Sequence, residues 1–264
     1  MLTDASGGVK PSSRERVALG YVAPGRHAAL AFLAARPSAV RRLLVAGDVD
    51  EDVGRAARSI GLVSERVDRR DLDVLAGGVP HQGIAAVGEA PPGVALADVV
   101  RARQPLVLAL DGLTDPRNVG AIFRSASAAG VQTVLLARDR APALSPSLVK
   151  AAAGAVEWVD VARVTNLARA LGELADAGYW VLGLDGDGET DLYDPAALPG
   201  APVVLVAGSE GKGLRRLTQR VCHLLLRIPM DGPLESLNVS VAVALALFEL
   251  RRRLPAGSGA TAAG

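Results

Sequence analysis

Three polar segments that contain glycine lie in the C-terminal half of the chain: 111–124 (DGLTDPRNVGAIFR), 204–214 (VLVAGSEGKGL) and 228–249 (IPMDGPLESLNVSVAVALALFE). Each follows an expected strand and leads into an expected helix, which is where open α/β sheets bind ligands. Together they offer amides, a guanidinium, a carboxylate and backbone that can approach a ligand. They therefore predict one site that positions a substrate through hydrogen bonds and charge.

In the first segment, Pro116 and Gly120 allow a tight entry into a helix that reaches Arg124. We expect this helix to hold the amide of Asn118 at its mouth and the guanidinium of Arg124 about a turn and a half further in. The alternative interpretation is an N-capping Asn118 followed by a surface Arg124.

The second segment is not a nucleotide-triphosphate loop. A Walker A motif needs Gly where the chain has Val206, and Ser or Thr after Lys212 where it has Gly213. What remains is a flexible backbone that can approach a ligand closely and that holds Glu210 among glycines. An ordinary turn with a solvated Glu210 is the alternative.

In the third segment, a loop with Met230 and Leu234 leads to Ser236 and Asn238 at the start of a strongly apolar helix. Such a loop offers apolar side chains and free backbone groups, which can hold a purine. We expect Ser236 to cap the helix. The helix is apolar on more than one face, which predicts burial in the core or against a second subunit. A core helix with an ordinary cap is the alternative.

Composition excludes several other sites. The net charge of +1 and the 3% aromatic content leave no overall attraction to nucleic acid and no rows of stacking rings, so any RNA contact must be local. The acidic stretch from Asp185 lacks the glutamate of a calcium loop, because its twelfth position is Ala196. One cysteine, Cys222, and three scattered histidines predict neither a disulfide nor a metal site.

Apolar periodicity divides the chain into two α/β units. Residues 15–89 form the smaller unit, and residues 105–254 alternate strands and helices, which predicts a mostly parallel sheet covered on both faces. We interpret residues 90–104 as a linker, and 1–14 and 255–264 as disordered tails. With neither a signal peptide nor a membrane-spanning run, a cytoplasmic protein is expected.

The expected elements are as follows. Helices in the smaller unit are expected at 27–36, 52–60 and 71–75, and strands at 41–45 and 62–67. In the larger unit the strands are expected at 106–110, 131–137, 157–162, 179–184, 203–207 and 224–228, and the helices at 119–129, 147–153, 166–177, 213–220 and 237–252.

The three polar segments, in this order, resemble the three motifs of the SpoU (TrmH) family of RNA ribose 2'-O-methyltransferases, in the SPOUT superfamily. The matching residues are Asn118, Gly120, Arg124, Gly208, Ser209, Glu210, Gly211, Ser236, Leu237, Asn238, Val239 and Ser240. The resemblance implies an α/β-knot domain whose C-terminal segment forms a deep trefoil knot. It also implies S-adenosylmethionine as methyl donor, no metal, and a homodimer with active sites at the subunit interface.

The smaller unit carries a second resemblance. Residues 27–33 (HAALAFL), 43–46 (LLVA) and 81–85 (HQGIA) resemble the substrate-binding domain of the SpoU branch that methylates a guanosine in large-subunit (23S) rRNA. That domain is similar to a ribosomal RNA-binding protein. The same reaction on tRNA or on an antibiotic-target loop of rRNA remains open, as does a non-catalytic ribosome-assembly factor that binds RNA.

The resemblance also implies roles for individual residues. Arg124 is expected to hold a phosphate of the target and help activate the 2'-hydroxyl, because a guanidinium with a pKa above about 12 binds phosphate readily and accepts a proton poorly. The other catalytic candidates are Asn118, Glu210, Ser236 and Asn238, and the cofactor-binding candidates are Ala207, Gly208, Ser209, Gly211, Ile228, Met230, Ser236 and Leu237. Arg41 and Arg42, with Arg124, are the candidate RNA-binding residues.

Overall fold

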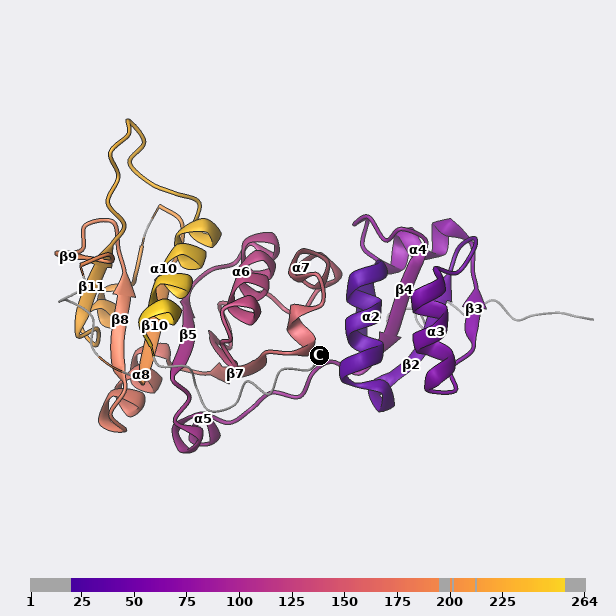
Figure 1. Ribbon diagram of the computed structural model, residues 1–264, viewed down its shortest axis with the longest axis horizontal. Coiled ribbons are helices and arrows are strands. Elements are labelled where there is room, and N and C mark those ends of the chain that lie inside the picture. Colours follow the sequence, from indigo (N-terminus) through magenta and orange to yellow (C-terminus); the bar gives the residue numbers. More distant parts are fainter. Residues whose placement is uncertain (1–19, 195–199, 201, 212, 255–264) are drawn as a thin grey trace, which may run out of the picture.

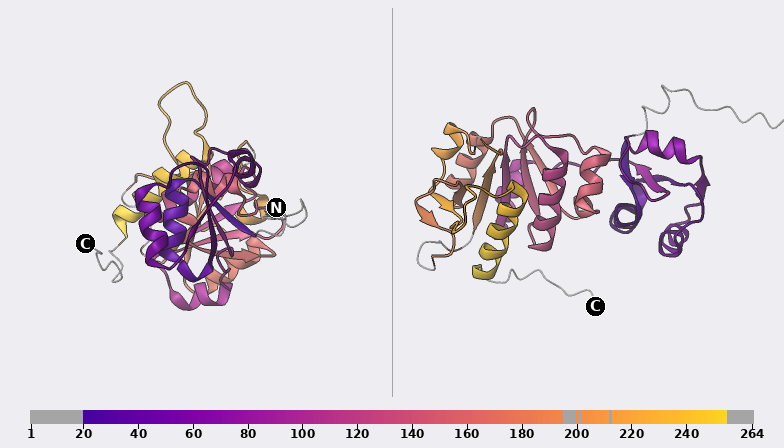
Figure 2. Two further views of the ribbon diagram at one scale, coloured as in Figure 1. Left: turned by 90° about the vertical axis from the view of Figure 1, so that its right-hand side faces the viewer. Right: turned by 90° about the horizontal axis from the view of Figure 1, so that it is seen from above.

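The computed structural model describes residues 20–194, 200, 202–211 and 213–254, which form two α/β units side by side along the longest axis of the molecule (Figures 1 and 2). The predicted tails at 1–14 and 255–264 lie outside the described residues. No helix of the described part is long and apolar enough to cross a membrane.

The smaller unit contains a four-stranded sheet with the order β1-β4-β2-β3. Only β2 and β3 pair in parallel, whereas β4 pairs antiparallel with both β1 and β2. The strands are β1 (Tyr21–Pro24), β2 (Val40–Val45), β3 (Ser64–Arg66) and β4 (Ile84–Gly88), and the helical segments are α2 (Arg26–Ala35), η1 (Pro37–Ala39), α3 (Glu51–Ser59) and α4 (Arg69–Leu75).

The larger unit is a parallel seven-stranded sheet with the order β7-β6-β5-β10-β8-β11-β9. Its strands are β5 (Leu106–Asp111), β6 (Thr133–Ala137), β7 (Asp160–Val164), β8 (Trp180–Leu184), β9 (Thr190–Asp191), β10 (Val203–Gly208) and β11 (Leu224–Arg227). Its helical segments are α5 (Leu96–Ala102), α6 (Pro116–Ala128), α7 (Pro146–Ala152), η2 (Ala155–Glu157), α8 (Leu167–Asp176), α9 (Arg216–Gln219) and α10 (Val239–Arg253).

Alternate side chains of the buried strands belong to two hydrophobic cores, one on each face of this sheet. Leu106, Leu108 and Leu110 of β5 belong to the core that includes α6, α7 and α10. Val107 and Ala109 belong to the opposite core, which includes α5 and α8. Successive side chains of a strand point to opposite faces, so the continuous apolar runs cover both sides. The predicted α/β class, with a parallel sheet covered on both faces, is confirmed.

Several element boundaries differ from expectation. Glu157 was expected in a strand, but it ends η2, and β7 begins only at Asp160. The helix expected at 213–220 shortens to α9, because Gly213 has a φ of +60° and pairs with Ser209 before the helix begins. The segment expected as a linker contains α5 and is part of the larger unit's core, since Val99 is buried there.

The two units meet through a buried polar cluster. The carboxylate of Glu157 in η2 accepts hydrogen bonds from the Tyr21 hydroxyl and from Nε of Arg36, the latter at 2.8 Å. The Arg36 guanidinium also lies 4.6 Å from the centre of the Phe32 ring. Burial, followed by the Glu157 charge, raises the pKa of Tyr21. No local pattern predicts this contact, because its members are distant along the chain.

We expect Glu157→Ala to lower the free energy of unfolding by about 3 kcal/mol, because it leaves the largely buried Arg36 without its carboxylate partner. Urea denaturation followed by circular dichroism measures this change. Glu173→Ala is the matched control: it removes an exposed ion pair with Arg169, and should cost less than about 1 kcal/mol. Equal losses in the two variants would contradict the structural role of Glu157.

Candidate active site

A cleft of about 980 Å³ opens at the carboxyl ends of β8 and β10 and beside β11. It holds all eight residues that the sequence predicted to bind the cofactor: Ala207, Gly208, Ser209, Gly211, Ile228, Met230, Ser236 and Leu237. Glu210 and Asn238, two of the predicted catalytic residues, also line it. The second and third polar segments therefore meet in one concave site.

The floor of the cleft depends on close backbone packing. A Cβ atom on Gly208 would lie 2.1 Å from the carbonyl carbon of Gly213. After Gly208, the backbones of Ser209 and Gly213 form two hydrogen bonds with each other, of 3.1 and 2.9 Å. Gly211, which lies between them in the chain, has a φ of +75°. The glycines of the second segment thus fold the chain back on itself and expose its backbone to the cleft.

A polar network joins the three sequence segments at this cleft. Nδ2 of Asn238 donates to Oε1 of Glu210 at 2.8 Å and to Oδ1 of Asn118 at 3.1 Å. Nδ2 of Asn118 donates to the same Glu210 oxygen at 3.2 Å. Glu210 and Asn118 are 28 and 120 positions from Asn238 along the chain, and the fold brings both into direct contact with it.

Helix capping places the two asparagines. Asn238 is the N-cap of α10, and its Oδ1 accepts from the Ser240 amide at 2.9 Å. The prediction that Ser236 caps this helix is therefore wrong, because Ser236 lies two residues before it. Asn118 is not a cap either, since Asp115 caps α6 by accepting from the Arg117 amide. Asn118 is thus free to bond across the site.

The cleft is acidic. Asp185, Asp187, Glu210 and Glu235 line it, and none of the lining residues that the structure describes is Arg, Lys or His. This wall favours a cationic ligand over a phosphate. The described residues contain no group of three or more His, Cys, Asp and Glu side chains that could hold a metal ion.

Sequence reasoning missed the part of the wall that follows β8. The stretch from Asp185 was interpreted as a solvated turn, but Asp185 and Asp187 line the cleft. Oδ2 of Asp185 accepts from Nε2 of Gln219 at 3.0 Å, which ties α9 to this wall. The signal was available: like the three segments, this stretch follows a buried strand and carries polar residues and glycine.

Arg124 does not line the cleft. It lies on α6, six residues beyond Asn118, which corresponds to a rise of about 9 Å along the helix. Its side chain is exposed and makes no hydrogen bond or ion pair within the described part of the chain. A single chain therefore does not bring this predicted catalytic residue to the polar network.

The candidate RNA-binding arginines of β2 both have carboxylate partners. Arg41 pairs with Glu89, and Arg42 donates to Glu65 from Nη2 at 2.6 Å and from Nε at 3.0 Å. The hydrogen bond from Arg42 lowers the pKa of Glu65. These partners offset the charge that a basic patch would need, so RNA contact by Arg41 and Arg42 stays a prediction.

The comparisons with known proteins agree with this architecture. Residues 105–248 match the SpoU rRNA Methylase family, and residues 22–93 match the domain described as RNA 2'-O ribose methyltransferase substrate binding. The chain is 44% identical over 243 residues to a 23S rRNA (guanosine-2'-O-)-methyltransferase RlmB of Pseudomonas aeruginosa, which covers 88% of this chain and 96% of that protein.

Two solved structures are also similar. An rRNA methyltransferase from Sinorhizobium meliloti, solved with bound AdoMet, is 26% identical with a TM-score of 0.74, covering 93% of this chain and 92% of that one. A TrmH-family protein from Porphyromonas gingivalis described as a possible RNA methyltransferase is 29% identical with a TM-score of 0.70, covering 92% of this chain and 94% of that one.

The parallel sheet with a cleft at its carboxyl edge and the small α/β unit beside it correspond to the two matched family domains, so the chain is a two-domain enzyme of the RNA methyltransferase class. The chain belongs to the SpoU rRNA methylase family and carries its substrate-binding domain.

Proposed function

We propose that this protein transfers a methyl group from S-adenosylmethionine to the ribose 2'-hydroxyl of a guanosine in 23S rRNA. The observation that carries this proposal is the hydrogen-bonded network of Asn118, Glu210 and Asn238, which joins the three family motifs at one cleft. The RlmB relative acts on a guanosine of 23S rRNA according to its name, and it is similar over 88% of this chain.

The cleft suits the methyl donor in charge and in polarity. S-adenosylmethionine carries a sulfonium, an ammonium and a carboxylate group and is cationic overall, which suits a wall with four carboxylates and no described basic residue. Ile228, Met230 and Leu237 provide apolar contact for an adenine. The exposed backbone around Gly208 can bond the polar edges of the nucleoside. The methyl donor of the Sinorhizobium meliloti enzyme supports the same assignment.

The bound cofactor supplies a methyl group on a sulfonium, ready for in-line displacement. Both asparagine amides donate to Oε1 of Glu210, which orients the carboxylate and leaves Oε2 to accept a further hydrogen bond. We assign that bond to the 2'-hydroxyl of the target, so Oε2 would take the hydroxyl proton as the oxygen gains the methyl group and the methyl carbon–sulfur bond breaks, with the donor leaving as a neutral thioether. Ser236 lines the same cleft and contacts the substrate or the donor.

We also propose a homodimer, because α10 presents an unpartnered apolar stripe. Val241, Leu245 and Phe248 are 48, 40 and 52% exposed and recur at helical spacing on one face. The opposite face of α10 is buried against the core through Val243 and Leu247. Since α10 packs against α6, a partner on this stripe lies next to the helix that carries Arg124. We place Arg124 at the partner's cleft in this dimer, where it binds the target phosphate.

Phe248→Glu is expected to convert the protein from a dimer to a monomer, because it places a charge at the centre of a desolvated apolar contact. Sedimentation velocity measures the oligomeric state. Val63→Glu is the matched control, since Val63 is 82% exposed in the other unit, and this variant should stay dimeric. A dimer that persists in Phe248→Glu would contradict the placement of the interface on α10.

The C-terminal segment is proposed to form the trefoil knot that the family resemblance implies. The strand order supports it: β10 lies between β5 and β8, so the chain returns to the middle of the sheet after building both flanks. It then leaves β11 through the exposed loop 228–237, which projects from the unit (Figure 1), and α10 packs back against α6 and β10.

Methylation of defined RNAs tests the proposed reaction. The purified protein is incubated with labelled S-adenosylmethionine and, separately, with unmodified 23S rRNA and total tRNA, and the modified nucleotide is mapped. We expect label on the 2'-oxygen of one guanosine of 23S rRNA. Label in tRNA alone would overturn the substrate assignment. Donor binding without transfer to free RNA or to ribosomal particles would favour a non-catalytic assembly factor.

A further inference from the structure

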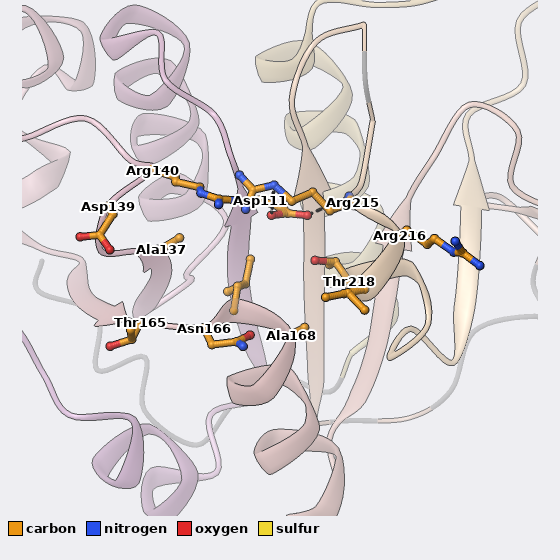
Figure 3. A pocket seen from close by; sticks show the side chains of 12 residues that line it. Asp111, Ala137, Asp139, Arg140, Thr165, Asn166, Ala168, Arg215, Arg216 and Thr218 are labelled. Carbon is orange, nitrogen blue, oxygen red and sulfur yellow. Dashed lines mark hydrogen bonds and ion pairs between the residues drawn. The ribbon is translucent and has the colours of Figure 1, made fainter.

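A second pocket, of about 390 Å³, opens at the carboxyl ends of β5 and β6 and at the start of α8 (Figure 3). Asp111, which ends β5, forms its centre, and Asn166, the N-cap of α8, lies on its lower side. The α9 segment from Arg215 separates it from the first cleft, because Gln219 of that segment lines the first cleft instead. The pocket is thus a neighbour of the active site on the same sheet edge.

Asp111 is only 1% exposed, yet one of its oxygens lacks a donor. Oδ2 accepts from the backbone amide of Arg215 at 2.9 Å. Oδ1 accepts no hydrogen bond from the residues that the structure describes, although it forms an ion pair with Nε of Arg215 at 3.5 Å. Buried carboxylate oxygens are nearly always hydrogen-bonded. An O–H or N–H donor of a ligand in this pocket would therefore meet an oriented acceptor.

Positive groups surround that acceptor. Arg140 and Arg215 direct their guanidinium groups toward each other above Asp111 (Figure 3). Arg140 is exposed, and its side chain has no hydrogen-bond or ion-pair partner among the residues that the structure describes. Leu167 and Ala168 also line the pocket, and their backbone amides, the first of α8, have no acceptor within the helix. These donors suit a phosphate.

Charge and position connect the pocket to RNA. Its lining carries three arginines against two aspartates, whereas the first cleft has four carboxylates and no described basic residue. The walls of this pocket therefore offer a nucleic-acid strand phosphate contacts that the walls of the first cleft, within one chain, do not. The short loop 112–115 joins Asp111 to α6, which carries Asn118 of the catalytic network. A strand whose target ribose lies at that network can reach the pocket with a neighbouring nucleotide.

We propose that this pocket binds a ribonucleotide of the substrate RNA that flanks the methylated nucleotide. Its phosphate contacts Arg140 and the first amides of α8, and a ribose hydroxyl donates to Oδ1 of Asp111. This inference rests on the proposed RNA methylation, and it adds a site that specifies the register of the strand. A ribose donor also gives the pocket a means to prefer RNA over DNA.

Binding of a mononucleotide tests the pocket without any catalytic step. Uridine 5'-monophosphate is titrated into ¹⁵N-labelled protein saturated with S-adenosylhomocysteine, which occupies the first cleft. We expect the amide signals of Leu167 and Ala168 to shift, and 2'-deoxyuridine 5'-monophosphate to bind at least about threefold more weakly. Equal binding of the two nucleotides would overturn the ribose contact, and unshifted amides would overturn the pocket.

Steady-state methylation tests the connection to the RNA. Arg140→Ala is expected to raise KM for the RNA about tenfold, with kcat and KM for S-adenosylmethionine unchanged, because one phosphate contact is lost. Arg101→Ala is the control, since Arg101 is exposed on α5 and pairs only with Asp98. Unfolding midpoints of both variants should equal that of the parent protein.

Different results would refute the flanking-nucleotide site and the proposed methylation. A parent protein that methylates rRNA, together with an Arg140→Ala variant of unchanged KM for RNA, would refute the flanking-nucleotide site and leave the proposed function intact. A parent protein that methylates no RNA would refute the proposed function, while the nucleotide titration still reports whether the pocket binds a ribonucleotide.

Discussion

Arg124→Ala is expected to slow methyl transfer to 23S rRNA by at least about a hundredfold while leaving the affinity for S-adenosylmethionine unchanged. The guanidinium is exposed, has no partner within the described residues and lies outside the donor cleft. We expect it to act in the proposed dimer with bound RNA, by holding the phosphate beside the reacting hydroxyl. Single-turnover methylation and isothermal titration of the donor measure the two quantities independently.

A second substitution at the same position separates charge from geometry. Arg124→Lys keeps the positive charge and loses the bidentate contact, so it should recover only part of the rate. Arg101→Ala, on the far face of the sheet, should retain the parent rate. Full turnover of Arg124→Ala on the mapped RNA would rule out the role that the first motif implies for this residue.

Gly208→Ala is expected to weaken S-adenosylmethionine binding by at least about tenfold. The added methyl group would lie 2.1 Å from the carbonyl carbon of Gly213, 2.2 Å from its oxygen and 2.4 Å from the Leu214 amide nitrogen. All three are backbone atoms, which cannot rotate away as a side chain could. The whole turn must move, and with it the Ser209 and Glu210 groups that line the cleft.

Gly172→Ala provides the control for this substitution. Gly172 lies within α8, and a Cβ atom there meets nothing within 4 Å. We expect unchanged donor binding and an increase of about 0.5–1 kcal/mol in the free energy of unfolding, because alanine is the better helix former. Parent-like donor affinity in Gly208→Ala would show that the turn is not the contact surface for the cofactor.

Much of the larger unit could be predicted from local patterns. Its strands are continuous apolar runs and most of its helices have clear periodicity, so their order and approximate ends follow from residue type. The smaller unit was harder. β1 (YVAP) and β4 (IAAVG) are short and buried along their whole length, and they end in proline and glycine, so neither shows the alternation that distinguishes a strand from a buried loop.

The candidate site shows a similar division. Its eight cofactor-binding candidates were found because glycine, proline and polar residues interrupt an apolar chain at strand ends, and all eight line one cleft. The cap of α10 was assigned wrongly, because Ser236 and Asn238 are both good capping residues and only the backbone geometry selects Asn238. Asp185 was missed because an acidic turn has the same composition whether it faces solvent or a ligand.

The sequence by itself determined the α/β class, the order of the main elements, the family and the three segments that supply the chemistry, because each depends on residue types close together along the chain. Only the tertiary structure decided that Asn118, Glu210 and Asn238 bond to one another, that Glu157 joins the two units, and that Arg124 lies away from the network in a single chain. These facts depend on which strand ends meet across the sheet. Long-range contacts of this kind leave no local pattern, since any polar residue at a strand end could serve equally well until the sheet order places it.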